Sequence, residues 1–153
     1  MLFEIYKKIK KQNKYVGINF MFYYNQRNGL IMKNFYLINI RKYNDDRGCL
    51  IPFEYEKNCP FEIKRAFVIN DVPNKNISRG KHINIKSKYL IIAIKGQVTI
   101  ICKNAEQKKT FVLKDNTKAL FINNGVYREL LNFSNDTILL CLSDSLYDEK
   151  EFV

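Results

Sequence analysis

The strand-like stretch His82-Ile83-Asn84 holds the only histidine of the chain, and an imidazole is the side chain best suited to proton transfer near neutral pH. Side chains two residues apart on a β-strand point to the same face, so we expect His82 and Asn84 to face a common site. An asparagine amide cannot take up a proton near neutral pH. The pattern therefore predicts a site in which one imidazole is the general acid or base.

The same stretch aligns with the first of two strand patterns by which cupin barrels are recognised, a His-x-His pair followed by an acid, although Asn84 stands at the second histidine and Tyr89 at the acid. The second pattern falls on residues 123–132. Of the metal-ligand positions in these patterns, only the one at His82 holds a good ligand. Asn84 coordinates metals weakly, Tyr89 is an unusual ligand, and Arg128 places a cation where a metal would sit. We therefore expect no metal and no other cofactor.

The elements that must position these residues are short β-strands, which follow one another from Met32 onward at a spacing of about 8 to 12 residues. This spacing is typical of a sandwich or barrel, and the content of ten Tyr and eleven Phe favours packed sheets over a helical bundle. Helical periodicity is nearly absent, and we expect the acidic tail Tyr147–Glu151 to be a solvated end rather than part of a site. The expected strands are Phe35–Arg41, Cys49–Tyr55, Lys64–Asn70, His82–Lys86, Tyr89–Ile94, Gln97–Lys103, Lys108–Leu113, Ala119–Ile122, Val126–Asn132 and Thr137–Leu142.

The length of 153 residues and the hydrophobic content of 46% suit a single domain with a well-filled core. We divide the chain into a basic N-terminal extension over residues 1–31, with an amphipathic helix expected over Leu2–Lys11, and a domain over residues 32–153. The chain has no run of eighteen apolar residues and no signal-peptide pattern, so we expect a cytoplasmic protein. Its four cysteines form no C-x-x-C pair and are expected to be reduced, mostly buried thiols.

The formal net charge of +11 would attract phosphates, nucleic acids or an anionic membrane. One alternative is therefore a nucleic-acid-binding barrel whose Tyr and Phe side chains stack on bases. The lysines form no clear stripe, however, and we expect neither nucleic acid nor membrane as a partner. The sequence also lacks the P-loop, Rossmann and nucleophile-elbow patterns.

Five blocks of sequence resemble the dTDP-4-keto-6-deoxyhexose 3,4-ketoisomerases, small WxcM-like cupins, in order and approximate spacing. The resemblance covers about residues 35 to 153. It implies an all-β, RmlC-like cupin or jelly-roll barrel that binds a dTDP-linked keto-deoxysugar, works without a metal, and forms a homodimer through exchanged N-terminal strands. The blocks are Asp46–Leu50, Pro60–Arg65, Ser78–Gly80, Asn132–Ser134 and Tyr147–Glu149.

The family moves protons between C3 and C4 of the sugar through an enediol, using a histidine pair and a nearby tyrosine. His82 matches the first histidine, whereas Asn84 stands in the place of the second. The resemblance then leaves three side chains as possible replacements for the missing partner: Tyr127, Tyr89 and Glu129.

Binding residues are also implied by the resemblance. Arg47, Arg65 and Arg79 match family positions near the nucleotide-sugar pocket, where a guanidinium suits a diphosphate. Arg128, together with Tyr89 and Glu129, occupies further altered polar positions of that pocket.

Two functional hypotheses follow from this resemblance. In the first, the protein is a ketoisomerase that serves deoxysugar supply for surface glycans. In the second, it is a catalytically impaired cupin that binds a nucleotide sugar or assists a neighbouring enzyme.

Overall fold

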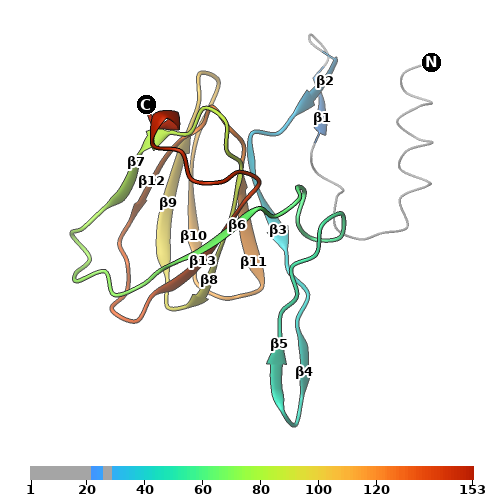
Figure 1. Ribbon diagram of the computed structural model, residues 1–153, viewed down its shortest axis with the longest axis vertical. Coiled ribbons are helices and arrows are strands. Elements are labelled where there is room, and N and C mark those ends of the chain that lie inside the picture. Colours follow the sequence, from blue (N-terminus) through green and yellow to red (C-terminus); the bar gives the residue numbers. More distant parts are fainter. Residues whose placement is uncertain (1–21, 26–28) are drawn as a thin grey trace.

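The computed structural model describes residues 22–25 and 29–153, and these form an RmlC-like cupin barrel of two antiparallel sheets, which confirms the expected fold class. One sheet has the order β3-β11-β8-β13-β6 and the other β10-β9-β12-β7, and Figure 1 shows them packed face to face. The larger sheet comprises β3 (Phe35–Asn39), β6 (Arg65–Ile69), β8 (Tyr89–Lys95), β11 (Lys118–Ile122) and β13 (Ile138–Ser143). The smaller comprises β7 (Arg79–Ile83), β9 (Val98–Lys103), β10 (Lys108–Leu113) and β12 (Tyr127–Leu131).

Strand β8 is buried on both faces because it lies at the centre of the larger sheet. Ile91 and Ala93 pack into the barrel interior against the smaller sheet, whereas Leu90 and Ile92 face outward under a second apolar cluster. This outer cluster is completed by residues from outside the sheet, among them Phe61. Full burial of an aliphatic side chain contributes about 1.5–3 kcal/mol to the stability of the fold. Strand β8 therefore holds its inward-facing side chains in a well-packed setting.

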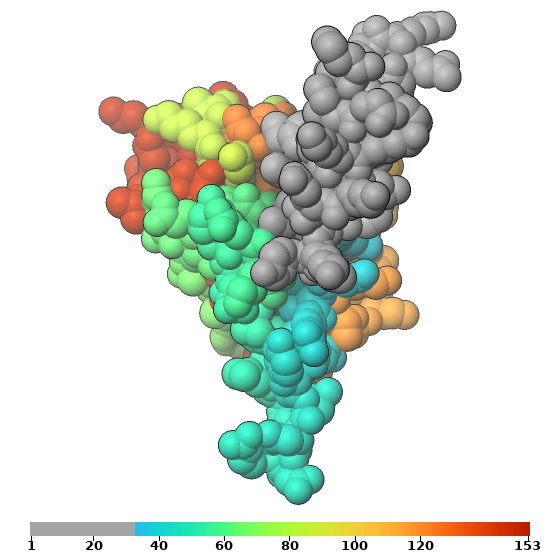
Figure 2. All heavy atoms as spheres, turned by 90° about the vertical axis from the view of Figure 1, so that its right-hand side faces the viewer, coloured from blue at the N-terminus to red at the C-terminus, as the bar shows by residue number. Residues whose placement is uncertain are grey.

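Two hairpins leave the barrel, β1 (Phe22–Asn25) with β2 (Gly29–Met32) and β4 (Tyr43–Asp45) with β5 (Gly48–Leu50). The β4–β5 hairpin projects from one end of the molecule, as Figures 1 and 2 show. The sequence predicted a longer strand, Cys49–Tyr55, and missed β4, because its three residues are all exposed and carry no apolar alternation.

Several expectations about the chain as a whole can be compared with the described residues. The helix expected over Leu2–Lys11 lies outside them. Within them, no helix is long and apolar enough to cross a membrane. Cys59, Cys102 and Cys141 are buried thiols, as expected, whereas Cys49 is exposed.

Candidate active site

A cavity of about 430 Å³ lies between the two sheets and is bounded by the C-terminal segment. Its walls combine cationic and aromatic side chains, which suits an anionic ligand with a planar or apolar part. The strands contribute Arg65, Phe67 and Ile69 from β6, Arg79, Gly80 and His82 from β7, Tyr89 and Ile91 from β8, Arg128 and Leu130 from β12, and Cys141 from β13, and the C-terminal segment adds Tyr147 and Phe152.

An irregularity in the pairing of β7 with β12 sets up the centre of the cavity. Arg128 pairs with His82, and the register shifts before Glu129, which pairs with Gly80. Gly80 has a φ of +80°, and a Cβ on it would lie 2.9 Å from the Arg128 carbonyl oxygen. A glycine is therefore required at this β-bulge, which keeps His82 and Arg128 side by side on the inner face.

The hydrogen bonds of His82 define its tautomer. A guanidinium can only donate, so His82 Nε2 accepts from Arg128, at 3.3 Å, and Nδ1 carries the proton and donates to the Gly80 carbonyl, at 3.0 Å. Burial and the positive charge of Arg128 lower the pKa of His82 below its usual value, against smaller opposing effects of the Gly80 bond and Glu151. The imidazole is therefore neutral at pH 7 and can accept a proton at Nε2.

Asn84 shares the inner face with His82, as the alternation predicted, and its amide bridges two buried charges. Its Oδ1 accepts a hydrogen bond from Arg128, and its Nδ2 donates one to Glu151. Arg128 is 7% exposed and Glu151 1% exposed. Because one charge only donates and the other only accepts, the orientation of the amide is fixed.

Tyr89 is held between two guanidinium groups. Its hydroxyl accepts from Arg65, at 2.9 Å, and the Arg128 guanidinium carbon lies 4.2 Å from its ring centroid. The Arg65 Nε atom is buried and has no hydrogen-bond partner among the described residues. A buried donor of this kind is costly unless a ligand or water satisfies it.

The sequence of this chain matches a known protein family. The family model of FdtA, WxcM-like, C-terminal matches residues 33–153. The chain belongs to this family. It is 29% identical over 117 residues to the TDP-4-oxo-6-deoxy-alpha-D-glucose-3,4-oxoisomerase of Aneurinibacillus thermoaerophilus, covering 76% of this chain and 84% of the relative.

Solved structures of related enzymes agree with the family membership. WlaRA, a TDP-fucose-3,4-ketoisomerase from Campylobacter jejuni, superposes with a TM-score of 0.75 at 35% identity, covering 79% of this chain and 89% of its own. A histidine-to-asparagine mutant of the 3,4-ketoisomerase QdtA from Thermoanaerobacterium thermosaccharolyticum, in complex with TDP-4-keto-6-deoxyglucose, gives 0.74 at 32% identity, covering 80% and 88%.

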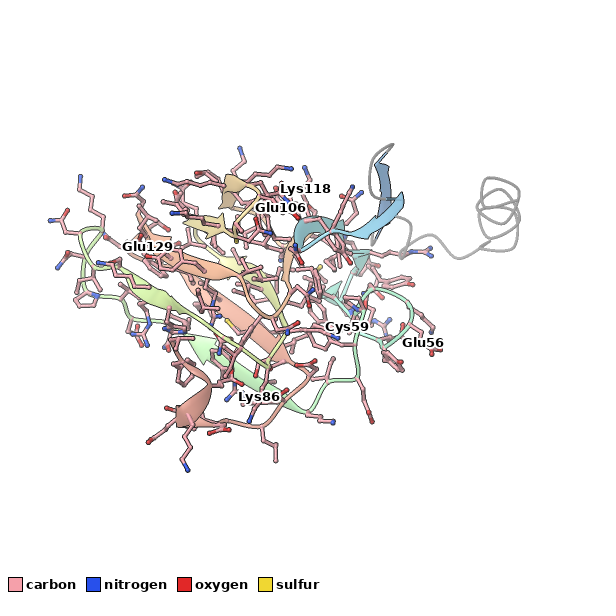
Figure 3. All side chains as sticks on the ribbon, turned by 90° about the horizontal axis from the view of Figure 1, so that it is seen from above. Glu56, Cys59, Lys86, Glu106, Lys118 and Glu129 are labelled. Atoms are coloured by element: carbon pink, nitrogen blue, oxygen red, sulfur yellow. The ribbon has the colours of Figure 1, made fainter. Side chains whose placement is uncertain are left out.

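The structure does not bring every predicted residue into the cavity. Tyr127 and Glu129 flank Arg128 on β12 and therefore point to the opposite face of the sheet. The Tyr127 hydroxyl donates to Glu129, at 3.4 Å, and Glu129, labelled in Figure 3, lies 3.8 Å from Lys81 Nζ. The structure places neither side chain in the cavity. The catalytic role of Tyr127 and the substrate-binding role of Glu129 were predicted from matched positions, without regard to strand alternation.

Arg47 also lies away from the cavity. It is on the turn of the β4–β5 hairpin, where it forms an exposed ion pair with Asp45, at 2.5 Å. Within a single chain this hairpin projects away from the barrel (Figure 1), so Arg47 does not join Arg65 and Arg79 at the cavity wall.

The C-terminal segment contributes two residues that the sequence did not predict, Glu151 and Phe152. The acidic tail was expected to be solvated, yet Glu151 is buried, and the Phe152 ring lies 4.7 Å from the His82 ring, centroid to centroid. A usable signal was present, because Tyr147–Glu149 is one of the blocks that carry the family resemblance. An apolar Phe152 three residues after the end of that block indicates a segment that returns to the core.

Proposed function

We propose that the protein is a TDP-4-keto-6-deoxyhexose 3,4-ketoisomerase. The observation that carries the proposal is a neutral imidazole, His82, lying beside the Arg128 guanidinium at the wall of a cavity that Arg65 and Arg79 also line. The related ketoisomerases support the choice of substrate and reaction.

The proposed ligand fits the charge of the cavity. Guanidinium groups bind diphosphates through forked, charge-assisted hydrogen bonds, which is the role we assign to Arg65 and Arg79. The presence of both arginines in the cavity wall supports this assignment. The rings of Tyr147 and Phe152 offer aromatic surface to the planar or apolar parts of the ligand.

In the proposed reaction, the bound substrate draws the Arg128 hydrogen bond from His82 Nε2 to the C4 carbonyl oxygen, which frees the Nε2 lone pair. His82 Nε2 then removes the C3 proton, which is acidic because C3 lies next to the C4 carbonyl. The electrons of the C3–H bond form the C3–C4 double bond of an enediolate, whose negative oxygen at C4 is stabilised by Arg128. Protonation of that oxygen, loss of the O3 proton and delivery of a proton to C4 complete the 3-keto sugar. The sum breaks C3–H and O3–H and forms C4–H and O4–H.

The proton exchange between O3 and O4 needs a second group, for which we propose Tyr89. Of the three side chains that the resemblance left open, Tyr89 alone lines the cavity, and Asn84 cannot exchange a proton near neutral pH. The hydroxyl of Tyr89 can both donate and accept, and Arg65 already orients it.

We further propose that the protein is a cytoplasmic homodimer that acts in deoxysugar supply for surface glycans. The exposed β4–β5 hairpin, with Leu50 at 65% exposure, is a surface that a second copy can cover. Arg47 would then reach substrate only through such a dimer. Light scattering at several protein concentrations tests the dimer, since a monomer throughout would remove the assigned role of Arg47.

The test of the function is to incubate the purified protein with TDP-4-keto-6-deoxyglucose and to follow the sugar carbons by NMR, with TDP binding measured in parallel by calorimetry. The proposal expects a 3-keto product and TDP binding. TDP binding without any 3-keto product would instead support the impaired nucleotide-sugar binder. Absence of both would reject the proposed ligand.

A further inference from the structure

The last residues of the chain add a short strand-like segment to the open edge of β7. Ile83 N donates to the Val153 carbonyl, at 2.7 Å, Val153 N donates to the Ile83 carbonyl, at 3.1 Å, and Ile85 N donates to the Glu151 carbonyl, at 3.1 Å. A 3₁₀ turn over Glu149–Glu151 precedes this pairing. These backbone bonds fix where Glu151 enters the site.

The turn is also anchored from outside. The Asp148 carboxylate accepts from Lys150 N, at 3.0 Å, and lies 3.3 Å from Lys86 Nζ. Figure 3 shows Lys86 beside this C-terminal turn. The segment is thus attached to the barrel on both sides of Glu151.

The Glu151 carboxylate is almost fully buried at the end of this segment. It accepts hydrogen bonds from Asn84 Nδ2, from Ser87 Oγ at 2.7 Å and from the Tyr89 hydroxyl at 3.5 Å. No Lys, Arg or His nitrogen of the described residues forms an ion pair with it. A buried charge without a direct counter-ion is costly and needs its hydrogen-bond partners and a nearby opposite charge.

The nearby opposite charge is Arg128, which Glu151 reaches through a single amide. Asn84 donates to Glu151 and accepts from Arg128, and Arg128 donates in turn to His82 Nε2. The four side chains form one continuous row of hydrogen bonds, with the negative charge at one end and the imidazole at the other.

We propose that Glu151 is a positioning residue of the active site. It orients the Asn84 amide so that Arg128 is held against His82, and this contact keeps the imidazole in the form that bears its proton on Nδ1. The role rests on the proposed function, because it serves the proton transfer assigned to His82. The site is therefore completed by the C-terminal segment and not by the barrel alone.

The test compares Glu151→Gln with Glu149→Gln, which removes the same charge from an exposed side chain of the same turn. Since the chain has one histidine, the ¹⁵N NMR shifts of its imidazole report the tautomer of His82 without assignment. We expect E151Q to lower kcat by on the order of tenfold to a hundredfold with little change in KM, and to shift the ring nitrogens toward the Nε2-protonated form. E149Q should match the wild type in kcat and in the ring-nitrogen shifts.

An E151Q protein with wild-type ring-nitrogen shifts and kcat overturns the proposal. If E151Q does not fold, the same measurements are made on Glu151→Asp, which keeps the charge but withdraws it by one methylene. Its kcat and its His82 ring-nitrogen shifts should change in the same direction as expected for E151Q, but by less. If the wild type itself makes no 3-keto sugar, the proposed function fails, yet the ring-nitrogen shifts still decide whether Glu151 positions His82.

Discussion

The two faces of strand β12 differ in what their polar side chains do. On the inner face Arg128 is buried and contacts Asn84, His82 and the ring of Tyr89. On the outer face Tyr127 and Glu129 bond to each other, half-buried, away from the cavity. Neighbouring residues of one strand thus have unrelated roles. A residue at a matched motif position can take part in the chemistry only when its side chain points to the face that lines the cavity.

The largest expected effect is that of His82→Gln on the inner face. Removing the only imidazole takes away the proposed base, so kcat should fall by about 100- to 10,000-fold. Turnover of TDP-4-keto-6-deoxyglucose measures this loss, and a calorimetric TDP titration serves as the control for an intact cavity. A variant that retains wild-type turnover would show that the inner face does not work through His82.

Arg128→Met should lower kcat by about a hundredfold, because it removes the proposed donor to the enediolate oxygen. It also leaves Glu151 buried without its balancing charge, which should lower the free energy of unfolding. The positive charge of Arg128 lowers the pKa of His82, so the pKa measured by NMR titration should rise in the variant. An unchanged or lower pKa would contradict the contact between the two residues.

Asn84→His would restore the histidine pair of the family on the inner face. The new imidazole would lie between Arg128 and Glu151, accepting from the one and donating to the other. We expect kcat to rise by about tenfold, since a second side chain could then exchange protons. An unchanged rate in a folded variant would mean that position 84 does not limit the reaction.

The pH dependence should follow the neutral form of His82. Burial, followed by the charge of Arg128, lowers the pKa of His82, and the deprotonated imidazole is the active base. The value of kcat/KM should therefore be constant around pH 7 and fall only as the pH drops through a pKa below about 6.5. A fall that already begins above pH 7 would contradict a neutral resting imidazole.

The smallest effects are expected on the outer face. Tyr127→Phe and Glu129→Gln should each change kcat by less than about twofold and the unfolding free energy by no more than about 0.5 kcal/mol. Turnover assays and urea denaturation measure both quantities. A loss of activity comparable to that of an inner-face variant would contradict the view that only the inner face takes part in the reaction.

The barrel itself could be predicted from the sequence because its strands carry local signals. The apolar runs at β8, β9, β11 and β13 and the turn residues between them coincide with the observed elements. The shared face of His82 and Asn84 followed from alternation alone. These features depend on neighbouring residues and are readable without a structure.

The rest of the site depends on contacts between residues far apart in the chain. Glu151 bonds to Asn84 across 67 positions, so the composition of the tail indicated only a solvated end. Tyr127 and Glu129 were assigned by motif, although β12 turns them outward. The bulge at Gly80, which sets His82 beside Arg128, appears only when β7 and β12 are paired.

The central claim is that His82, on the inner face of the barrel wall, removes the C3 proton of a 4-keto sugar nucleotide. It is tested most directly by incubating the wild-type protein with TDP-4-keto-6-deoxyglucose in deuterated buffer and examining the recovered sugars by NMR. We predict deuterium at C3 of the remaining substrate together with a 3-keto product. Recovery of undeuterated substrate without any 3-keto product, from a protein that binds TDP, would contradict it.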